Sequence, residues 1–289
     1  MYTLIYDGGK PDKLIKFLDG KTALSYGRLL SLLRRGEIRI NQKKVYENSA
    51  LAKGDLISVY ADAAPPLSIV YEDENILAAY KRKGIKTDGD DGFFGEITSV
   101  EKYKNLILCH RLDTNTDGIV LFAKTAACER AVIAAFKEHA VEKKYIALVC
   151  GLFKEPNGIK TAYLAKDENE GEAEVRGRYF DGSREIKTRF DVIRTLPGRN
   201  LTLLDITLIT GKTHQIRAHL KYLGYFIAGD GKYGDEKTNR LLKISKQQLT
   251  AYKIAFKAGE SSPLKYLNQK TIELSDPESF IRFPTQPAQ

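Results

Sequence analysis

The sequence is poor in several residue types that mark particular classes of protein. Its 289 residues include only three cysteines, one methionine, nine prolines and no tryptophan. Cys109, Cys128 and Cys150 form no CxxC pair and no even-numbered framework, so they indicate neither a zinc site nor a disulfide-stapled secreted domain. We expect all three to be small buried hydrophobic side chains in a reducing compartment.

Long apolar segments are also lacking. No run approaches the roughly 18 apolar residues of a membrane span, and the opening MYTLIYDGGK has no signal-peptide pattern. We therefore expect a cytoplasmic protein with no membrane partner. Hydrophobic residues make up 43% of the chain and charged residues 29%, a balance that excludes disordered and collagen-like classes and allows a folded core.

What the sequence has in excess is positive charge. It contains 46 Lys and Arg against 37 Asp and Glu, a formal net charge of +9, which favours a polyanionic partner. Between residues 28 and 44, six basic residues oppose Glu37 alone: Arg28, Arg34, Arg35, Arg39, Lys43 and Lys44. A solvated face would explain such a run, but basic residues at a helix end and an adjoining hairpin suit contacts to phosphates.

The first 64 residues read as a small separate module. Apolar residues at helical spacing predict one helix around residues 14–18 and a second around residues 29–35, which Gly36 ends. Alternation then predicts short strands at residues 37–41 and 55–60. Residues 61–66, ADAAPP, suit a stiff linker, so we place a domain boundary between residues 64 and 65.

Residues 65–289 are expected to form one larger domain of α+β class. Strands predominate and no regular βαβ alternation is present, which favours a mostly antiparallel or mixed sheet flanked by helices. The predicted strands are residues 68–71, 76–80, 106–109, 118–123, 144–149, 190–194 and 201–208. The predicted helices are residues 126–139 and 213–223, and the polar stretch 166–185 is expected to be a long loop or hairpin tip.

The N-terminal module resembles an S4-type RNA-binding domain. The resemblance rests on LLRRGEIRIN at residues 32–41 and KGD at residues 53–55, and it covers about 50 residues. It implies a small α/β module that binds structured RNA, with the basic residues of the 28–44 segment on its binding surface.

The polar run HRLDTNTDG at residues 110–118 lies between two apolar strands and has three explanations. The first half of a calcium loop fits residues 113–118, but the twelfth position is Lys124 where a bidentate glutamate is required. An ordinary hairpin turn fits the Asp, Asn, Thr and Gly content. A catalytic role is the third explanation, and it needs partners elsewhere in the chain.

The segment TGKTHQIRAHL at residues 210–220 also carries a cationic face. Its GKT ending resembles a phosphate-binding P-loop, but Ile206 stands where that motif requires glycine. His214, Arg217 and Lys221 recur at helical spacing, opposite the apolar residues. The start of this helix is therefore a candidate site for anions.

Three segments in order, HRLD at 110–113, EKKY at 142–145 and TGKTHQIRAHL at 210–220, resemble the motifs of RluA-type RNA pseudouridine synthases. The likeness covers about residues 66–256. It implies a pseudouridine synthase fold and the isomerisation of particular uridines to pseudouridine, without metal or organic cofactor. The chain departs from the family pattern at Arg82, Lys212, Tyr225, Phe226 and Thr250.

The resemblance also implies residue roles. By motif position the catalytic aspartate is Asp113, Tyr145 is expected to pack against the target base, and Arg217 is expected to pair with Asp113. The remaining residues that we expect at the active site or on RNA are His110, Arg111, Leu112, Lys212 and His214.

These residue types suit the chemistry. Exchanging a C1′–N1 bond for a C1′–C5 bond needs a carboxylate that serves as nucleophile or base, and an adjacent guanidinium fixes its direction. The flat ring of Tyr145 suits a base taken out of its stack.

The expected substrate is structured RNA, in particular large-subunit (23S) ribosomal RNA, handled by a monomer without an obligate protein partner. Two other hypotheses stay open: a tRNA-directed pseudouridine synthase, and a non-catalytic RNA-binding or ribosome assembly factor. The joint presence of Asp113, Tyr145 and Arg217 argues against the second.

Overall fold

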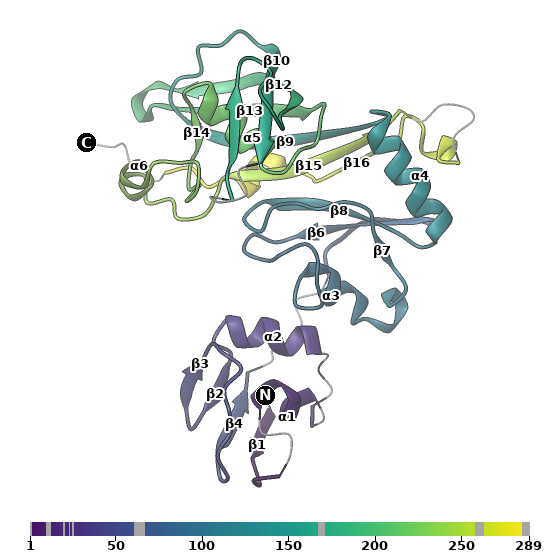
Figure 1. The fold of residues 1–289 in the computed structure, drawn as a ribbon, viewed down its shortest axis with the longest axis vertical. Helices are drawn as coiled ribbons and strands as arrows, with labels where there is room; N and C mark the ends of the chain where they lie inside the picture. The colour runs from purple at the N-terminus through teal and green to yellow at the C-terminus, as the bar shows by residue number, and fades with distance from the viewer. Residues whose placement is uncertain are drawn as a thin grey trace. The chain divides into compact units, whose positions relative to one another are not determined.

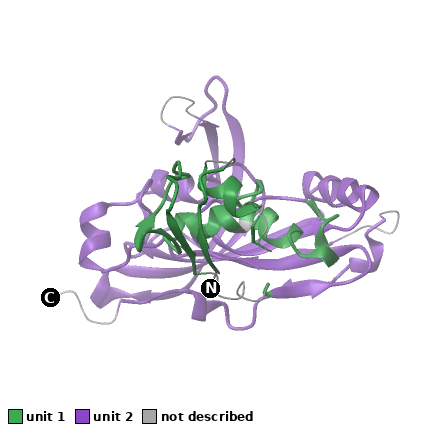
Figure 2. Cartoon of the chain, turned by 90° about the horizontal axis from the view of Figure 1, so that it is seen from below, with its two compact units in different colours: residues 1–68, 85–108 green, residues 69–84, 109–289 purple. Residues whose placement is uncertain are grey.

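A computed structural model describes residues 2–9, 13–19, 21, 22, 24, 26–60, 67–166, 171–257 and 263–284, except for the side chains of Tyr2 and Arg28. The chain divides into two compact units, one of residues 1–68 and 85–108 and one of residues 69–84 and 109–289 (Figure 2). The predicted linker at residues 61–66 lies outside the described residues. The grouping thus differs from a single division at residue 64, because residues 85–108 join the N-terminal unit.

The first unit combines a small antiparallel sheet with short helices (Figure 1). The sheet has the order β1-β4-β2-β3, and its strands are β1 (Tyr2–Ile5), β2 (Ile38–Ile40), β3 (Lys43–Val45) and β4 (Leu56–Val59). The other elements are α1 (Leu14–Asp19), α2 (Tyr26–Arg34), α3 (Phe93–Thr98), η1 (Glu101–Tyr103) and β7 (Ile107–Leu108). The two predicted N-terminal helices are present.

The apolar spacing of the first unit explains its core. Leu14, Leu18, Leu29 and Leu32 are fully buried in one cluster, which the apolar faces of α1 and α2 form with the sheet. Gly36 ends the second helix with φ +65°, and the amides of Gly36 and of the next residue donate to the carbonyls three and five residues back. This is the Schellman pattern, in which glycine accepts the left-handed conformation at no steric cost.

The second unit is built on a large mixed sheet (Figure 1). Its strand order is β11-β10-β12-β13-β9-β15-β8-β6-β5, with β14 beside β9 and β16 beside β15. The pairing of β8 with β15 is parallel, whereas the other pairings along this order are antiparallel. The predicted α+β class with a mostly antiparallel, mixed sheet is therefore confirmed.

The second unit contains the remaining strands and helices of the chain. The strands are β5 (Ile69–Glu72), β6 (Ile76–Lys81), β8 (Asp117–Ala123), β9 (Val141–Cys150), β10 (Gly158–Lys166), β11 (Ala173–Arg176), β12 (Arg184–Leu196), β13 (Leu201–Leu208), β14 (Phe226–Ile227), β15 (Leu249–Phe256) and β16 (Thr271–Glu273). The helices are α4 (Ala126–Lys137), α5 (Gln215–Tyr222), α6 (Glu236–Leu241), η2 (Pro197–Arg199), η3 (Lys265–Leu267) and η4 (Pro277–Phe280).

Of the two expectations for the stretch 166–185, the hairpin is present and the long loop is not, because β11 pairs antiparallel with the end of β10. One expectation about a helix was wrong. The helix expected at residues 213–223 begins only at Gln215, since His214 has φ +58° and stands outside the helical conformation. His214 therefore does not belong to a continuous helical face with Arg217 and Lys221.

The two faces of the large sheet bury different residues. Directly paired residues of neighbouring strands share a face. Tyr145 of β9 pairs with Ile206 and Ala251, and the next residue, Ile146, pairs with Thr250 on the opposite face. The face of Ile146 is covered by a cluster that includes Ile244 and Ile281.

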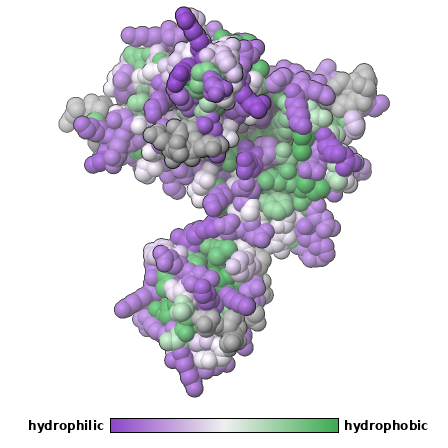
Figure 3. Space-filling model, in the orientation of Figure 1, coloured by the Kyte–Doolittle hydropathy of each residue, from purple (hydrophilic) through white to green (hydrophobic). Residues whose placement is uncertain are grey.

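The visible surface divides into hydrophilic and hydrophobic areas. Figure 3 shows that hydrophilic residues cover most of the visible face of each unit, with smaller hydrophobic areas between them. Among the described residues, no helix has both the length and the apolar character needed to cross a membrane.

Candidate active site

The HRLD segment leads into a loop that residues of the second unit anchor from several sides. The side chain of Lys81 is fully buried, and its Nζ donates to the carbonyl oxygen of Thr114 at 3.2 Å. The amide of Gly84 donates to the same oxygen, and Gln247 donates to Thr116 Oγ1 at 2.8 Å. These contacts hold the loop that carries Asp113, whose side chain is 24% exposed.

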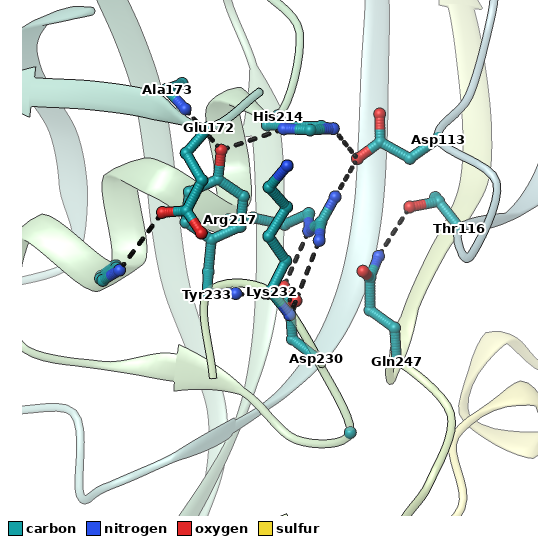
Figure 4. A network of polar contacts seen from close by, with 12 residues as sticks. Asp113, Thr116, Glu172, Ala173, His214, Arg217, Asp230, Lys232, Tyr233 and Gln247 are labelled. Carbon is teal, nitrogen blue, oxygen red and sulfur yellow. Dashed lines mark hydrogen bonds and ion pairs between the residues drawn. The ribbon is translucent and has the colours of Figure 1, made fainter. Parts of the chain in front are cut away.

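Arg217 is the direct partner of Asp113. Its Nη1 donates to Asp113 Oδ2 at 2.9 Å, and its side chain is only 7% exposed (Figure 4). The predicted pairing of these two residues is thus present in the structure. No hydrogen bond of Asp113 Oδ1 is found within the described part of the chain, so this oxygen is available for a substrate.

A second carboxylate, which the sequence did not reveal, fixes Arg217 from the other side. Asp230 accepts from Arg217 Nε at 2.7 Å and from Nη2 at 2.9 Å, and its side chain is fully buried. It also accepts from the amides of Lys232 and Tyr233. Burial raises the pKa of Asp230, but its bonds to Arg217 outweigh this and hold the pKa below its usual value.

The guanidinium of Arg217 is therefore shared between two acids. A bidentate pair with Asp230 sets its plane, and the remaining nitrogen points at Asp113. Burial lowers the pKa of Arg217, but the charges of Asp230 and Asp113 together raise it above its ordinary value. The cation also lies over the ring of Tyr233, 4.9 Å from the ring centre.

Tyr233 links this cluster to His214. Its hydroxyl accepts from the amide of Ala173 at 2.7 Å and lies 3.0 Å from Nδ1 of His214. When the hydroxyl donates its own proton to Nδ1, the imidazole carries its proton on Nε2, which faces Asp113 Oδ2 at 4.0 Å (Figure 4). Burial lowers the pKa of His214, although the charge of Asp113 opposes that shift.

The fold of α5 depends on the residues around its start. Gln215 is buried; its Nε2 donates to Thr188 Oγ1 at 3.0 Å, and its Oε1 accepts from the amide of Lys212 at 3.0 Å. These bonds tie the first turn of the helix to β12. They place Arg217 on the inner side of α5, whereas Lys221 stays exposed and faces Glu172 at 3.6 Å.

Tyr145 lies in the middle of the sheet beside this cluster. It is 7% exposed, and the hydroxyl makes no hydrogen bond within the described part of the chain. Burial and the charge of Asp113 both raise the pKa of its phenol, so the hydroxyl keeps its proton at neutral pH. Asp113, Tyr145 and Arg217 are thus brought together, from three segments far apart in the sequence.

Lys143, two residues before Tyr145, shares its face of β9. Burial lowers the pKa of the ammonium to about 8, and Nζ lies 4.7 Å from the ring centre of Phe136. A Cβ on Gly211 would stand 3.1 Å from that Nζ, which shows how closely the loop before α5 approaches the lysine. The sequence did not single out this cation, because it is one lysine in a run of two.

The other residues expected in the HRLD motif have different surroundings. His110 Nε2 accepts from the amide of Leu121 at 3.1 Å, and its ring meets Phe136 edge to face. Burial lowers the pKa of His110 to about 3, with Lys143 adding to the effect, so the ring is neutral. Arg111 and Lys212 are exposed, and Leu112 is buried.

The basic residues of the first unit are partly neutralised. Arg34 forms an ion pair with Asp91, and Arg35 pairs with Glu37 at 3.2 Å. Arg39 lies over the ring of Tyr60. Lys43 and Lys44 are exposed, and the side chain of Arg28 lies outside the described residues.

Potential metal ligands do not gather at this site. Within residues that the structure describes, no group of three or more His, Cys, Asp or Glu side chains could hold a metal ion. The three cysteines are buried as free thiols.

Comparisons with known proteins identify the family of the chain. The family model of RNA pseudouridylate synthases matches residues 75–222. The ribosomal large subunit pseudouridine synthase C of Vibrio vulnificus is 34% identical over 229 residues, 71% of each chain. The Haemophilus ducreyi protein of the same name is 33% identical over 251 residues, 78% of this chain and 77% of that one.

A solved structure shows the same fold. Human RNA pseudouridylate synthase domain containing 1 superposes with a TM-score of 0.62 at 22% identity, covering 76% of this chain and 90% of that one. Together with the family match, these findings establish that the chain belongs to the family of RNA pseudouridine synthases, enzymes that isomerise uridine in RNA. The predicted family and fold are confirmed, whereas the S4-like character of residues 1–64 stays a prediction.

Proposed function

We propose that this enzyme converts specific uridines of RNA to pseudouridine with Asp113 as its catalytic carboxylate. The observation that carries the proposal is the position of Asp113, one oxygen of which binds the buried Arg217 while the other has no protein partner among the described residues. A carboxylate held in this way has a fixed direction and a free reacting atom.

The chemistry is an isomerisation, so its atoms balance without a co-reactant. The C1′–N1 bond breaks, the uracil turns, and a C1′–C5 bond forms; C5 loses a proton and N1 gains one. Asp113 acts on the sugar or the base, either by attacking it as a nucleophile or by removing a proton as a general base. Asp230 positions Arg217, and the positive charge of Arg217 stabilises the ionised form of Asp113 during the reaction.

Tyr145 is proposed to hold the target base. Its side chain shares a sheet face with those of Ile206 and Ala251, and its ring is flat and apolar. The raised pKa of its phenol keeps the hydroxyl protonated, so it can donate a hydrogen bond or relay the C5 proton. A base removed from its stack needs such a surface, because unstacking costs a few kcal/mol.

The proposed substrate class is large-subunit ribosomal RNA, as the names of the two bacterial relatives state for those proteins. We further propose that the first unit, through its S4-like module, helps to dock the RNA, with Lys43 and Lys44 as exposed cations of its hairpin. Such a substrate agrees with the expected cytoplasmic location.

The test of the substrate class is a pseudouridine map. The purified enzyme is incubated separately with unmodified 23S ribosomal RNA and unmodified tRNA transcripts, and RNA from a strain lacking the gene is mapped beside the wild type. We expect pseudouridine at a few discrete 23S positions, and its loss at the same positions in the deletion strain. Modification of tRNA alone would assign the enzyme to tRNA, and no modification of any RNA would favour a binding protein.

A further inference from the structure

The second unit has a charged pocket on the sheet face opposite Tyr145. Its volume is about 480 Å³, within the range of small-ligand sites. The walls come from the end of β6, the start of β8, the segment before β15 and the C-terminal η4. Asp117 lines it and pairs with Thr250, which shares the face of Ile146 and not that of Tyr145.

The floor of this pocket is a carboxylate whose oxygens are already bound by donors of the protein. Asp117 is 4% exposed and accepts from Tyr80 at 2.6 Å, from Thr250 at 2.7 Å and from Lys83 at 3.2 Å. The three donors come from β6, from the turn that follows it and from β15, so the charge of Asp117 is compensated inside the wall. The floor is therefore a rigid, neutral platform.

The mouth of the pocket is positive. Arg82 adds a third cation to the exposed Lys246 and Arg282. Neither Lys246 nor Arg282 faces an acidic side chain among the residues that the structure describes. The backbone of Arg282 is fixed, because its amide donates to the side chain of buried Gln248 at 2.7 Å.

An aromatic wall completes the site. Phe280 and Tyr80 lie with ring centres 5.1 Å apart, both lining the pocket and both partly exposed. Cations that meet phosphate, next to an aromatic face that a base can stack on, are the two elements of single-stranded nucleic-acid binding. A surface that bound RNA by charge alone would not need an aromatic face.

We propose that this pocket binds a nucleotide of the substrate RNA a few positions from the target uridine. Its phosphate lies against Lys246 and Arg282, and its base stacks on Phe280. Asp113 precedes Asp117 by four residues, so their Cα atoms lie within about 14 Å, the reach of an extended chain. One RNA strand passing this end of the sheet contacts both faces. The inference rests on the proposed function for its choice of RNA.

The first experiment measures binding of an unmodified 23S ribosomal RNA transcript over a range of salt concentrations. The Lys246→Ala/Arg282→Ala variant is expected to raise Kd about tenfold and to lower the salt slope by about one for each lost phosphate contact. Lys154→Ala, an exposed lysine outside the pocket, is the matched control. An unchanged Kd and slope in the double variant, or an equal loss in the control, overturns the proposal.

The second experiment separates stacking from charge. Phe280→Ala is expected to raise Kd severalfold and Phe280→Trp to restore it, because both rings offer a stacking face. With 4-thiouridine in the transcript, crosslinks are expected on peptides containing residues 245–248 or 277–282. Crosslinks confined to other peptides, or equal binding by the alanine and tryptophan variants, contradict the proposal.

The same variants distinguish this proposal from the proposed function. In a working enzyme they are expected to raise KM while kcat at saturating RNA stays unchanged. If the wild type forms no pseudouridine in the transcript, the proposed function fails for that RNA, whereas the Kd comparison still decides whether the pocket binds it.

Discussion

A single guanidinium organises the candidate site at the scale of residues. Arg217 meets Asp230 through two nitrogens and Asp113 through the third. Two carboxylates share this one buried guanidinium, and the nearby Lys81 also interacts with the charge of Asp113.

Asp230 positions Arg217, so its substitution should disturb the geometry of the site without weakening the binding of RNA. Asp230→Asn keeps the shape but leaves Arg217 without its bidentate acceptor, and we expect kcat to fall 10- to 100-fold with little change in KM. Unfolding in urea should show a stability loss of about 3 kcal/mol, since a buried ion pair is broken.

The control is Asp235→Asn, which retains a good N-cap at the start of α6. Rate constants and urea midpoints of both variants are compared with the wild type. Equal loss of kcat in both variants, or a change in KM alone for Asp230→Asn, would rule out the positioning role.

His110 predicts a pH dependence of stability. Its pKa is about 3 in the folded protein against an ordinary value of 6.5, because the ring is buried. The unfolded chain therefore binds an additional proton below pH 6.5, and stability falls as the pH falls from 6.5 toward 3, by about 1.4 kcal/mol per pH unit.

His110→Gln can still accept from the amide of Leu121 but does not titrate. We expect the loss of unfolding free energy between pH 7.5 and pH 5 to be about 2 kcal/mol smaller in this variant than in the wild type. Urea titrations at both pH values measure it. His219, whose pKa burial lowers to about 4, contributes equally to both proteins. Identical pH dependences would show that His110 is not buried as a neutral ring.

The motif residues could be predicted from the sequence, whereas the residues that hold them in place could not. Asp113, Tyr145 and Arg217 occupy recognisable positions in three motifs. Asp230 follows a short apolar stretch among glycines and looks like a turn residue, because its role depends on a contact with a side chain 13 residues earlier. His110 lies in a motif, but its environment is set by β8 and α4, which local pattern does not reveal.

At the scale of elements, the parallel pairing of β8 and β15 requires glycine at one position. Gly118 has φ +126°, and a Cβ there would stand 2.1 Å from the carbonyl oxygen of Ala251. Gly118 also pairs with Lys81 of β6, so the strand is confined from both sides. The sequence showed a glycine at the start of a strand, and it did not show what would approach it.

Gly118→Ala should therefore destabilise the second unit by about 3 kcal/mol, combining backbone strain with overpacking. Gly158→Ala is a closely matched control, because its φ is +131° and nothing lies within 4 Å of the added Cβ. We expect the control to lose about 1 kcal/mol, the strain alone. Urea unfolding measures both, and equal losses would show that β15 does not crowd this position.

Element boundaries were predictable where the apolar period was regular. The helix over residues 126–139 and the strand over residues 201–208 match α4 and β13 closely. The start of α5 was placed two residues early, because His214 adopts a left-handed conformation that hydrogen bonding to Tyr233 supports. β11 alternates apolar and charged residues over only four positions, AEVR, so its pairing with β10 defines it more than its sequence pattern does.

At the scale of the whole molecule, the positive charge is less concentrated than the sequence indicates. Asp91 and Glu37 neutralise Arg34 and Arg35, and Asp91 lies 57 residues from Arg34 along the chain. The same segment supplies Glu96, which accepts from Ser31 at 3.3 Å. Such contacts explain why residues 85–108 group with the first unit, and no local pattern could have predicted them.

Charge reversal tests the role of the first unit in docking. The double change Lys43→Glu and Lys44→Glu, at two exposed cations of the hairpin, is expected to weaken binding of a 23S transcript at least tenfold and to reduce its salt dependence. Filter binding at several salt concentrations measures both quantities. If affinity and slope are unaltered while the thermal midpoint is unchanged, the S4-like module is not the docking surface.

Asp113→Asn tests whether this enzyme makes pseudouridine with Asp113 as its catalytic carboxylate. The amide keeps the size of the side chain but removes the charge that meets Arg217 and the reacting oxygen of a carboxylate. Pseudouridine formed in a 23S transcript should fall at least 10³-fold, with RNA affinity and thermal midpoint close to those of the wild type. Pseudouridine formation by Asp113→Asn at the wild-type rate would contradict the assignment.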